Sequence, residues 1–270
     1  MNIRAWELKK MIDKVEFAIH PDRYDMAGIC FEVEPEVLRL IATDGNVLSF
    51  VEENVHNGDE KWGGLIQSRF VNLIKDLCKE KMERAASKRN VADRIMTLEF
   101  NFEKDILYVS DLGEDFEYSV LVKSFPNWRN VQPQEPEFKA YVNRFELVNT
   151  LKSFKLPDKG TKHREIVQAE FGKDRLTITN FVDVASVEAS SKEDFTTYLN
   201  FGYLKKITKA HHQRKISQQV LEFGFSDSSL KPIVIGAIDH WSWLIWGKEI
   251  CNETVEKRLE IYPSHIRCGI

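Results

Sequence analysis

Long hydrophobic runs are missing from this sequence of 270 residues. No apolar stretch approaches the roughly 20 residues that a membrane-spanning helix needs. The N-terminal segment Met-Asn-Ile-Arg-Ala-Trp-Glu-Leu-Lys-Lys lacks the apolar core of a signal peptide. We therefore expect a cytoplasmic protein with no membrane partner. Its content of 43% hydrophobic and 30% charged residues is typical of a globular chain.

Cysteine is also scarce, and the four cysteines are far apart with no Cys-x-x-Cys pair. Zinc sites and redox dithiols usually have closely spaced cysteines, so the sequence favours reduced thiols and predicts no metal site. The catalytic signatures Gly-x-Ser-x-Gly and His-Glu-x-x-His are absent, as is a phosphate-binding glycine-rich loop. Acids and bases are available outside such motifs at Asp44, His20, His56, Asp239 and His240. We expect neither enzymatic activity nor a cofactor.

A strong excess of one charge sign is missing from the chain as a whole, whose net charge is -4. This value argues against a protein that binds nucleic acid with its whole surface. Positive charge is nevertheless concentrated locally. Residues 200–215 hold five basic and no acidic residues, residues 67–90 hold seven basic against three acidic, and residues 143–155 hold three against one.

Each of these positive segments, taken alone, is typical of a solvated helix surface. Together, in an acidic chain, they favour another interpretation, in which the helices share one surface that faces phosphate groups. Such contacts depend on charge and salt but not on base sequence. The sequence therefore predicts a sequence-independent surface for nucleic acid.

The apolar pattern of the first half alternates between the periods of helices and strands. A helix with one buried face is expected over 4–19, with the apolar residues Leu8, Met11, Ile12, Val15 and Ile19. Strands are expected at 28–33, 37–43 and 47–53, and a hairpin at 94–111. A second helix is expected to begin at Ser68, with an apolar stripe of Phe70, Leu73, Ile74 and Leu77.

The same order of elements recurs at an offset of about 138 residues, so the chain is an internal duplication. A helix from Asn143, strands over 164–181, a helix capped by Asn200 and strands over 218–238 repeat the first half. Prolines at 126, 133 and 136 mark the junction. We predict an α+β fold of two duplicated domains, residues 1–133 and 134–270, each with two helices packed on antiparallel sheets.

Four segments carry a resemblance to a known family. Residues 23–50, which contain Ala-Thr-Asp-Gly, closely resemble the middle domain of the bacterial DNA polymerase III β subunit, the sliding clamp. "SFPNWRNVQP", "YLNFGYLKKITKA" and "FGFSDSSLKPIVI" are similar to the family's link between its second and third domains and to parts of its third domain. The matches keep the family's order and spacing over most of residues 4–238, so the chain looks like two of the family's clamp domains.

The resemblance implies a protein that acts without bond chemistry. Clamp domains close into a ring whose helices line a central hole, and the ring encircles duplex DNA as a processivity factor in DNA replication. On this resemblance, the DNA-facing cations would be Lys10, Lys14, Arg69, Lys75, Lys79, Arg144, Lys152, Lys205, Lys206 and Lys209.

The chain departs from the family in its length, because the family has three domains per chain and closes as a dimer. If six domains are still needed around a duplex, two per chain predict a homotrimer with head-to-tail interfaces. A monomer, an open assembly or a partnered subunit stays open as an alternative. A clamp-derived protein that binds partner peptides without encircling DNA is a further alternative.

The resemblance also implies a groove between the two domains, in which polymerase and clamp loader peptides would bind. Its residues would be Arg23, Thr43, Gly45, Asn46, Leu48, Pro126 and Val131 from the first domain and Asn200 and Tyr203 from the second, with Gly45 and Leu48 on the rim. Two departures bear on its specificity: Asn46-Val47 replaces the family's His-Arg, and "HWSWLIWGKEI" with a further tail replaces its C-terminal motif. Trp241, Trp243 and Trp246 indicate either a core or interface strand or an aromatic partner site.

Overall fold

The structure is a computed structural model, and it describes residues 1–20, 22–55, 61–88, 95–101, 106–111, 114–119, 125–131, 136–160, 164–210, 220–225, 233–237 and 240–244. The first half consists of β1 (Asn2–Arg4), α1 (Ala5–Val15), the 3-10 helix η1 (Glu16–Ala18), β2 (Gly28–Glu34), β3 (Val37–Thr43), β4 (Val47–Asn54), β5 (Trp62–Gln67), α2 (Ser68–Lys88), β6 (Ile95–Asn101), β7 (Ile106–Asp111) and β8 (Glu114–Ser119).

The second half follows the 3-10 helix η3 (Trp128–Val131). It consists of β9 (Phe138–Asn143), α3 (Arg144–Ser153), β10 (Ile166–Phe171), β11 (Arg175–Thr179), β12 (Val184–Ser191), β13 (Phe195–Asn200), α4 (Phe201–Ala210), β14 (Val220–Phe225), β15 (Ile233–Ala237) and β16 (His240–Leu244). Both halves thus run strand, α-helix, four strands, α-helix, three strands. The predicted duplicated α+β fold is confirmed.

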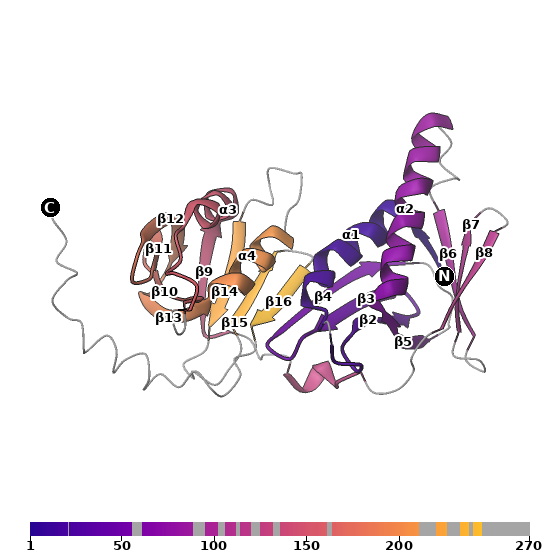
Figure 1. The fold of residues 1–270 in the computed structure, drawn as a ribbon, viewed down its shortest axis with the longest axis horizontal. Helices are drawn as coiled ribbons and strands as arrows, with labels where there is room; N and C mark the ends of the chain where they lie inside the picture. Colours follow the sequence, from indigo (N-terminus) through magenta and orange to yellow (C-terminus); the bar gives the residue numbers. More distant parts are fainter. Residues whose placement is uncertain are drawn as a thin grey trace, which may run out of the picture.

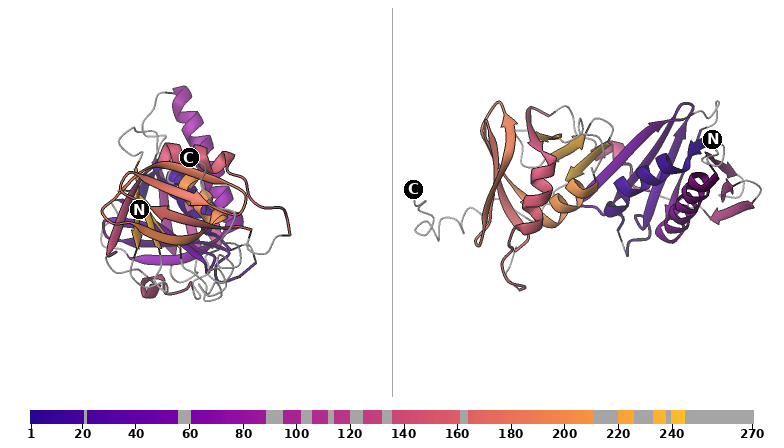
Figure 2. Two further views of the ribbon diagram at one scale, coloured as in Figure 1. Left: turned by 90° about the vertical axis from the view of Figure 1, so that its left-hand side faces the viewer. Right: turned by 90° about the horizontal axis from the view of Figure 1, so that it is seen from above.

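Antiparallel pairing joins the two halves into one long sheet. Its twelve strands run in the order β13-β10-β11-β12-β9-β14-β15-β16-β4-β3-β2-β5, and a second sheet has the order β1-β6-β7-β8. The link between the halves is β16, which pairs with β15 on one side and with β4 on the other. Figures 1 and 2 show the helices α3, α4, α1 and α2 in a row on one face of the long sheet.

The core lies between this row of helices and the sheet. On β2, Ile29, Phe31 and Val33 are buried toward the helices, so alternate residues of the strand point to the opposite face. On α1, the predicted residues Leu8, Met11, Ile12 and Val15 are all buried. One aromatic cluster fills the second half, where the Phe171 and Phe225 rings lie 4.8 Å apart.

The predicted apolar stripe of α2 is confirmed at Ile74, but Leu73 is exposed and Phe70 and Leu77 lie one position before the buried Val71 and Cys78. The buried apolar residues among the described side chains of this helix are Val71, Ile74 and Cys78, whereas Leu73 is 50% exposed. Successive residues on a helix are separated by about 100°, so a shift of one position turns the stripe away from the sheet. Val71 and Cys78 pack in the core with Ile74, and Phe70 and Leu77 lie at the margin.

The predicted cap at Asn200 is confirmed, and Asn143, where a helix was expected to start, is also a cap. The Asn143 Oδ1 accepts a hydrogen bond from the Glu146 backbone N–H (3.2 Å), and the Asn200 Oδ1 accepts one from the Tyr203 backbone N–H (3.1 Å). Each bond satisfies an N–H group that the helix itself leaves without an acceptor. The start of α4 is therefore fixed on the last residue of β13.

Three expectations fall wholly or partly on residues outside the described ones. The domain boundary near residue 134 lies there and stays a prediction, as does any role for the segment after residue 244. Trp241 and Trp243 lie on β16, the strand that joins the two halves, as the interpretation of a core or interface strand requires.

None of the helices described is both long and apolar enough to cross a membrane.

Gly28 allows a close approach between β2 and the edge strand β5. A Cβ at this position would lie 2.0 Å from the Ile66 carbonyl oxygen, closer than any real contact. We expect Gly28→Ala to lower the free energy of unfolding by about 1–3 kcal/mol, because the β2–β5 backbone must shift. Denaturant unfolding measures this. Gly172→Ala is the control, since its Cβ would meet its nearest atoms at 3.6 and 3.7 Å. Equal midpoints for the two variants would contradict the steric explanation.

Candidate functional site

The Ala-Thr-Asp-Gly segment forms a fully hydrogen-bonded turn between β3 and β4. The Asp44 Oδ1 accepts hydrogen bonds from the backbone N–H groups of Asn46 and Val47, both at 2.9 Å. The Thr43 hydroxyl donates to the Val47 carbonyl (2.8 Å) and accepts from the Gly45 N–H (3.1 Å). Gly45 has φ +90°, a conformation that favours glycine. Asp44 thus secures the turn.

The same turn contacts the second half of the chain through Tyr203. The Tyr203 hydroxyl donates to the Asp44 Oδ2 at 2.8 Å and accepts from the Asn46 Nδ2 at 3.3 Å. Burial, followed by the hydrogen bond to Asp44, raises the pKa of Tyr203 to about 12. The phenol therefore stays protonated at neutral pH and remains a donor. Four residues predicted for the groove from two separate domains, Thr43, Gly45, Asn46 and Tyr203, are brought together here.

A small apolar cluster lies beside this contact on the sheet face opposite the helices. It contains Cys30, Ile41, Leu48, Trp128 and Val234, with Phe50 and Phe125 packed against it. The Phe50 and Trp128 rings stack with centroids 5.6 Å apart. Leu48 is only 2% exposed, so it lies below the surface and not on a rim as expected.

The remaining predicted groove residues occupy different surroundings. Asn200 caps α4 beside Tyr203, and Pro126 is half-buried in the segment that carries Trp128. Val131 is the last residue of η3. Arg23 is exposed and forms an ion pair with Asp25 (2.9 Å), and among the described residues no contact joins it to Tyr203.

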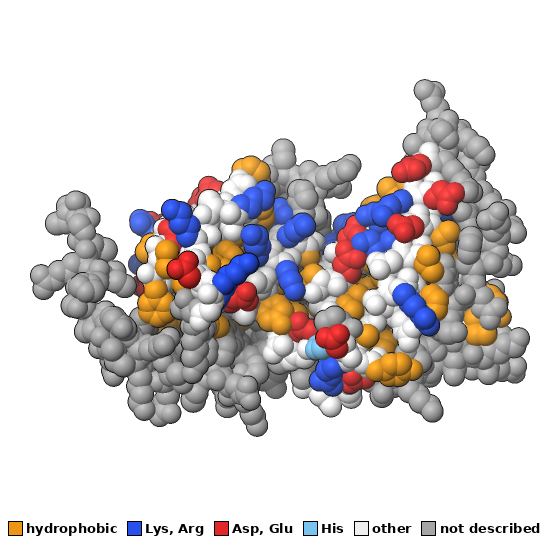
Figure 3. All heavy atoms as spheres, in the orientation of Figure 1, with side chains coloured by type: hydrophobic (Ala, Val, Ile, Leu, Met, Phe, Trp, Pro, Cys, Tyr) orange, Lys and Arg blue, Asp and Glu red, His pale blue; other side chains and the backbone are white. Residues whose placement is uncertain are grey.

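Positive charge remains exposed on the helices of the second half. Lys205, Lys206 and Lys209 of α4 and Lys152 of α3 are exposed, and none has an acidic partner among the described residues. The Lys206 Nζ lies 5.6 Å from the centre of the Tyr203 ring. Figure 3 shows Lys and Arg side chains gathered over α3 and α4.

On the helices of the first half, two of the five predicted cations form ion pairs with acidic side chains. Lys75 forms ion pairs with Asp13 (2.8 Å) and Glu16, and Lys79 pairs with Asp76 (2.8 Å). Figure 3 accordingly shows acidic and basic side chains mixed over α1 and α2. Of the other three predicted cations on these helices, Arg69 is exposed with its guanidinium 4.5 Å above the Phe70 ring, Lys10 is half-buried and Lys14 is buried.

Two predicted DNA-facing cations are corrected by their burial. Lys14 is 2% exposed and Arg144 is 7% exposed. The Arg144 Nε donates to the Thr208 carbonyl at 3.1 Å, which ties α3 to α4, and burial lowers the pKa of Arg144. The charge of the helices and the family resemblance placed both residues on the DNA-facing surface, but Arg144 is covered where α3 and α4 pack together.

Sequence reasoning missed the residues around Trp128, namely Glu32, Arg129 and the apolar neighbours Cys30 and Phe50. One signal was present: Cys30, Glu32 and Glu34 alternate with the buried Ile29, Phe31 and Val33, so they share the outer face of the sheet. The alternation shows the shared face. It does not show that residues 125–131 cross it.

Comparisons with known proteins agree with the fold. No profile of a protein family matches the chain. The chain is 22% identical over 221 residues to the beta sliding clamp of Treponema pallidum (strain Nichols), a match that covers 78% of this chain and 56% of that protein.

Among the described residues, no group of three or more His, Cys, Asp or Glu side chains is placed to hold a metal ion.

Solved structures give the same result. The DNA polymerase III β subunit of Thermotoga maritima matches with a TM-score of 0.75 and 21% identity, and a Bartonella birtlesii sliding clamp bound to griselimycin matches with 0.73 and 22%. Each match covers 91% of this chain but 64% of the other, so the chain spans less than two thirds of the length of these relatives. The chain has the fold of the bacterial sliding clamps, and the family resemblance in its sequence is confirmed.

Proposed function

We propose that this protein is a DNA polymerase processivity factor, a sliding clamp that encircles duplex DNA and tethers partner proteins through a groove between its two domains. One observation carries the proposal: the α-helices lie in a row on one face of the long sheet, and the exposed charge of α3 and α4 is positive. Mobile lysines on a helix surface attract phosphates of any sequence. They form no base-reading surface.

Among the described strands, two near the ends of the long axis, β8 and β12, have an edge that is wholly or partly unpaired. β8 pairs with β7 and, among the described strands, with no other. At the opposite end, β12 pairs with β11 along residues 184–188 and with β9 only at residues 189–191. Among the described strands, the second edge of residues 184–188 is therefore unpaired. Figure 1 shows β8 and β12 at opposite ends of the molecule. Two different complementary ends give a head-to-tail assembly.

The pairing inside the chain supplies a template for this assembly. β4 receives β16, the last strand of the second half, along residues 47–51. By the duplication, β12 is the counterpart of β4 and β8 is the counterpart of β16. The edge of β12 is marked by the exposed apolar residues Phe181, Val182 and Val184, of which Val184 is 60% exposed. In the proposed ring, β8 of the next copy covers this edge.

The ring is proposed as a homotrimer. The resemblance implies six domains around a duplex, and the two duplicated halves of this chain then require three copies. Processivity would follow from enclosure, because a closed ring stays on DNA even where each phosphate contact is weak. The proposed groove holds partners beside the Asp44–Tyr203 contact, with Leu48 below it.

The cations of α4 provide the first test. We expect replacement of Lys205, Lys206 and Lys209 by Glu to reduce retention on nicked circular DNA. The slope of log affinity against log salt should fall by roughly 0.9 for each phosphate that the variant no longer neutralises. The control replaces Lys173, Arg175 and Lys192, three exposed cations outside the helices, in the same way. An equal reduction in both variants would show only a net-charge effect.

The β12 edge provides the second test. We expect Val184→Asp to convert the assembly into monomers in light scattering, since a buried unpaired carboxylate is costly at a strand interface. Val220→Asp changes a similarly exposed valine on β14 and should leave the assembly intact. A wild-type chain that is a monomer, retained equally on circular and linearised DNA, would replace the ring with the alternative of a clamp-derived partner-binding protein.

Griselimycin, which the Bartonella birtlesii clamp binds, provides a probe for the groove. We expect the wild-type chain to bind griselimycin and Tyr203→Ala to weaken binding about tenfold, because the half-buried ring lies at the contact between the halves. Isothermal titration measures both. Tyr141→Ala removes an exposed tyrosine on β9 and serves as the control. Unchanged affinity in Tyr203→Ala would separate this tyrosine from the site.

A further inference from the structure

Residues 125–131, which follow β8 and precede β9 in the sequence, are here called the connector. They cross the outer face of the long sheet. Trp128 is the residue that anchors the connector, because its ring is 5% exposed and packs with Cys30, Leu48 and Val234. Figure 1 shows η3, which belongs to the connector, on the opposite side of the sheet from the helices. The connector therefore covers an apolar patch that the sheet would otherwise expose.

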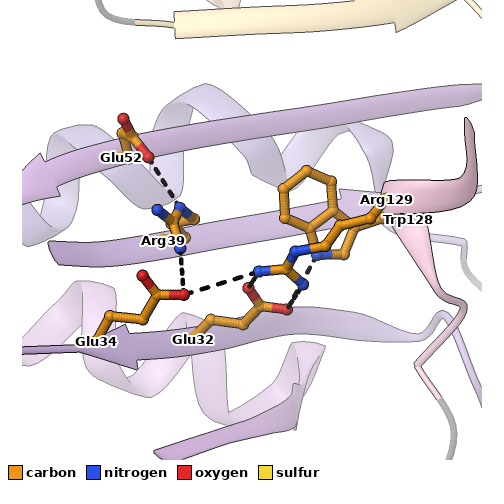
Figure 4. Close-up of polar contacts among 6 residues, drawn as sticks. All are labelled: Glu32, Glu34, Arg39, Glu52, Trp128 and Arg129. Carbon is orange, nitrogen blue, oxygen red and sulfur yellow. Dashed lines mark hydrogen bonds and ion pairs between the residues drawn. The ribbon is translucent and has the colours of Figure 1, made fainter. Parts of the chain in front are cut away.

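The connector is also held by a polar contact to β2, shown in Figure 4. The Trp128 Nε1 donates to the Glu32 Oε1 at 2.9 Å. Arg129 donates to both oxygens of the same carboxylate, at 3.1 and 2.8 Å, and its guanidinium lies 4.4 Å from the centre of the Trp128 ring. A bidentate contact of this kind fixes the orientation of the Arg129 guanidinium as well as its distance from the Glu32 carboxylate.

Glu32 is one member of a charged row that crosses three strands. In the sheet register, Glu32 of β2 faces Arg39 of β3, which faces Glu52 of β4. Arg39 forms ion pairs with Glu34 and Glu52, each at 2.8 Å. The three strands thus carry three carboxylates and one guanidinium, which pairs with two of them, and Arg129 of the connector pairs with the third, Glu32 (Figure 4).

The duplicated half supplies an internal comparison. There, Glu170 of β10 faces Thr177 of β11, which faces Ser186 of β12. The Thr177 and Ser186 hydroxyls lie 3.2 Å apart, so the row is neutral beyond Glu170. The same sheet forms without the charged row, and therefore the fold does not need it. The charged row occurs in the half whose outer face the connector crosses.

We propose that Glu32 and Arg129 are positioning residues that fix the connector on the sheet and thereby place the groove wall to which Pro126 and Val131 belong. Pro126 stands two residues before Trp128, and Val131 two residues after Arg129, so both move with this anchor. Leu48 packs in the same cluster as Trp128 and follows the Asp44 turn by four residues. This inference rests on the proposed partner groove.

Cys30 reports whether the connector stays in place. Its thiol is 6% exposed beneath the Trp128 cluster, and burial raises its pKa to about 12. At pH 8 it should react with iodoacetamide only where the connector has moved. Cys78 lies on the buried face of α2 and is the internal reference for general unfolding. Peptide mass mapping separates the labelling of Cys30 and Cys78 from that of the other cysteines.

In the full-length chain, we expect Arg129→Ala to raise the Cys30 labelling rate at least fivefold and to weaken griselimycin binding several-fold, with Cys78 unchanged. Arg129→Lys keeps the charge but cannot form the bidentate contact. Its Cys30 labelling rate and its griselimycin affinity should therefore lie between those of the wild type and those of Arg129→Ala. The control Arg175→Ala breaks the exposed Arg175–Asp174 pair of the second half and should change neither reading.

Three outcomes would overturn the inference, and they are distinguishable. Unchanged Cys30 labelling in Arg129→Ala would show that the ion pair does not hold the connector. Faster labelling with unchanged griselimycin affinity would show that the connector does not place the groove wall. Absence of griselimycin binding by the wild-type chain would refute the groove itself, and the positioning role with it, whatever the labelling shows.

Discussion

The pairing of β16 with β4 is the contact on which the rest of the structure depends. It joins two duplicated halves into one sheet, and its register sets Leu244 opposite Val47 at the end nearest the Asp44 turn. A slip of one residue would turn every side chain of β16 to the other face. The register also brings the start of α4 beside the turn, where Tyr203 reaches Asp44 and Asn46 from 159 and 157 residues away in the sequence. The row of helices and the contact of Tyr203 with the Asp44 turn thus both depend on the pairing of β16 with β4.

Duplication has produced two halves with the same elements but different surfaces. In the first half, Asp13 and Glu16 neutralise Lys75 between α1 and α2, and the helices are tied together by charge. In the second half, the corresponding tie is the buried Arg144, which donates to a backbone carbonyl of α4 and leaves the α4 lysines without acidic partners among the described residues. One helix pair therefore uses its cations for packing. The other leaves them available to phosphate, so the positive surface of the proposed ring would alternate around its circumference.

The sequence was sufficient for the four α-helices and for about half of the strands, but it did not predict β1, β5, β8, β9, β12 or β13, and it left β16 as one of two interpretations. It was also insufficient for the partners of individual side chains. Strand boundaries and the caps at Asn143 and Asn200 follow from local patterns, because period and capping are properties of a few neighbouring residues. Lys14 and Arg144 were misplaced because their burial depends on which helix packs beside them. Trp128 and Glu32 are 96 residues apart, and no local pattern shows that they meet. Tyr203 and the Asp44 turn were paired correctly only because a family resemblance carries three-dimensional information that periodicity lacks.

The connector shows how a junction between repeats can be anchored on the outer face of a sheet. A proline-containing segment has few ways to pair with a sheet, so it needs side-chain anchors to stay on one. Trp128 supplies the apolar anchor and Arg129 the charged one, on a row whose duplicate is neutral. Because the anchors lie between Pro126 and Val131, the proposed positioning role assigns the place of these two residues to an exposed ion pair and one buried ring. An ion pair of this kind contributes little to global stability, so its removal would alter the geometry beside the proposed groove while the two halves stay folded around the β16–β4 pairing.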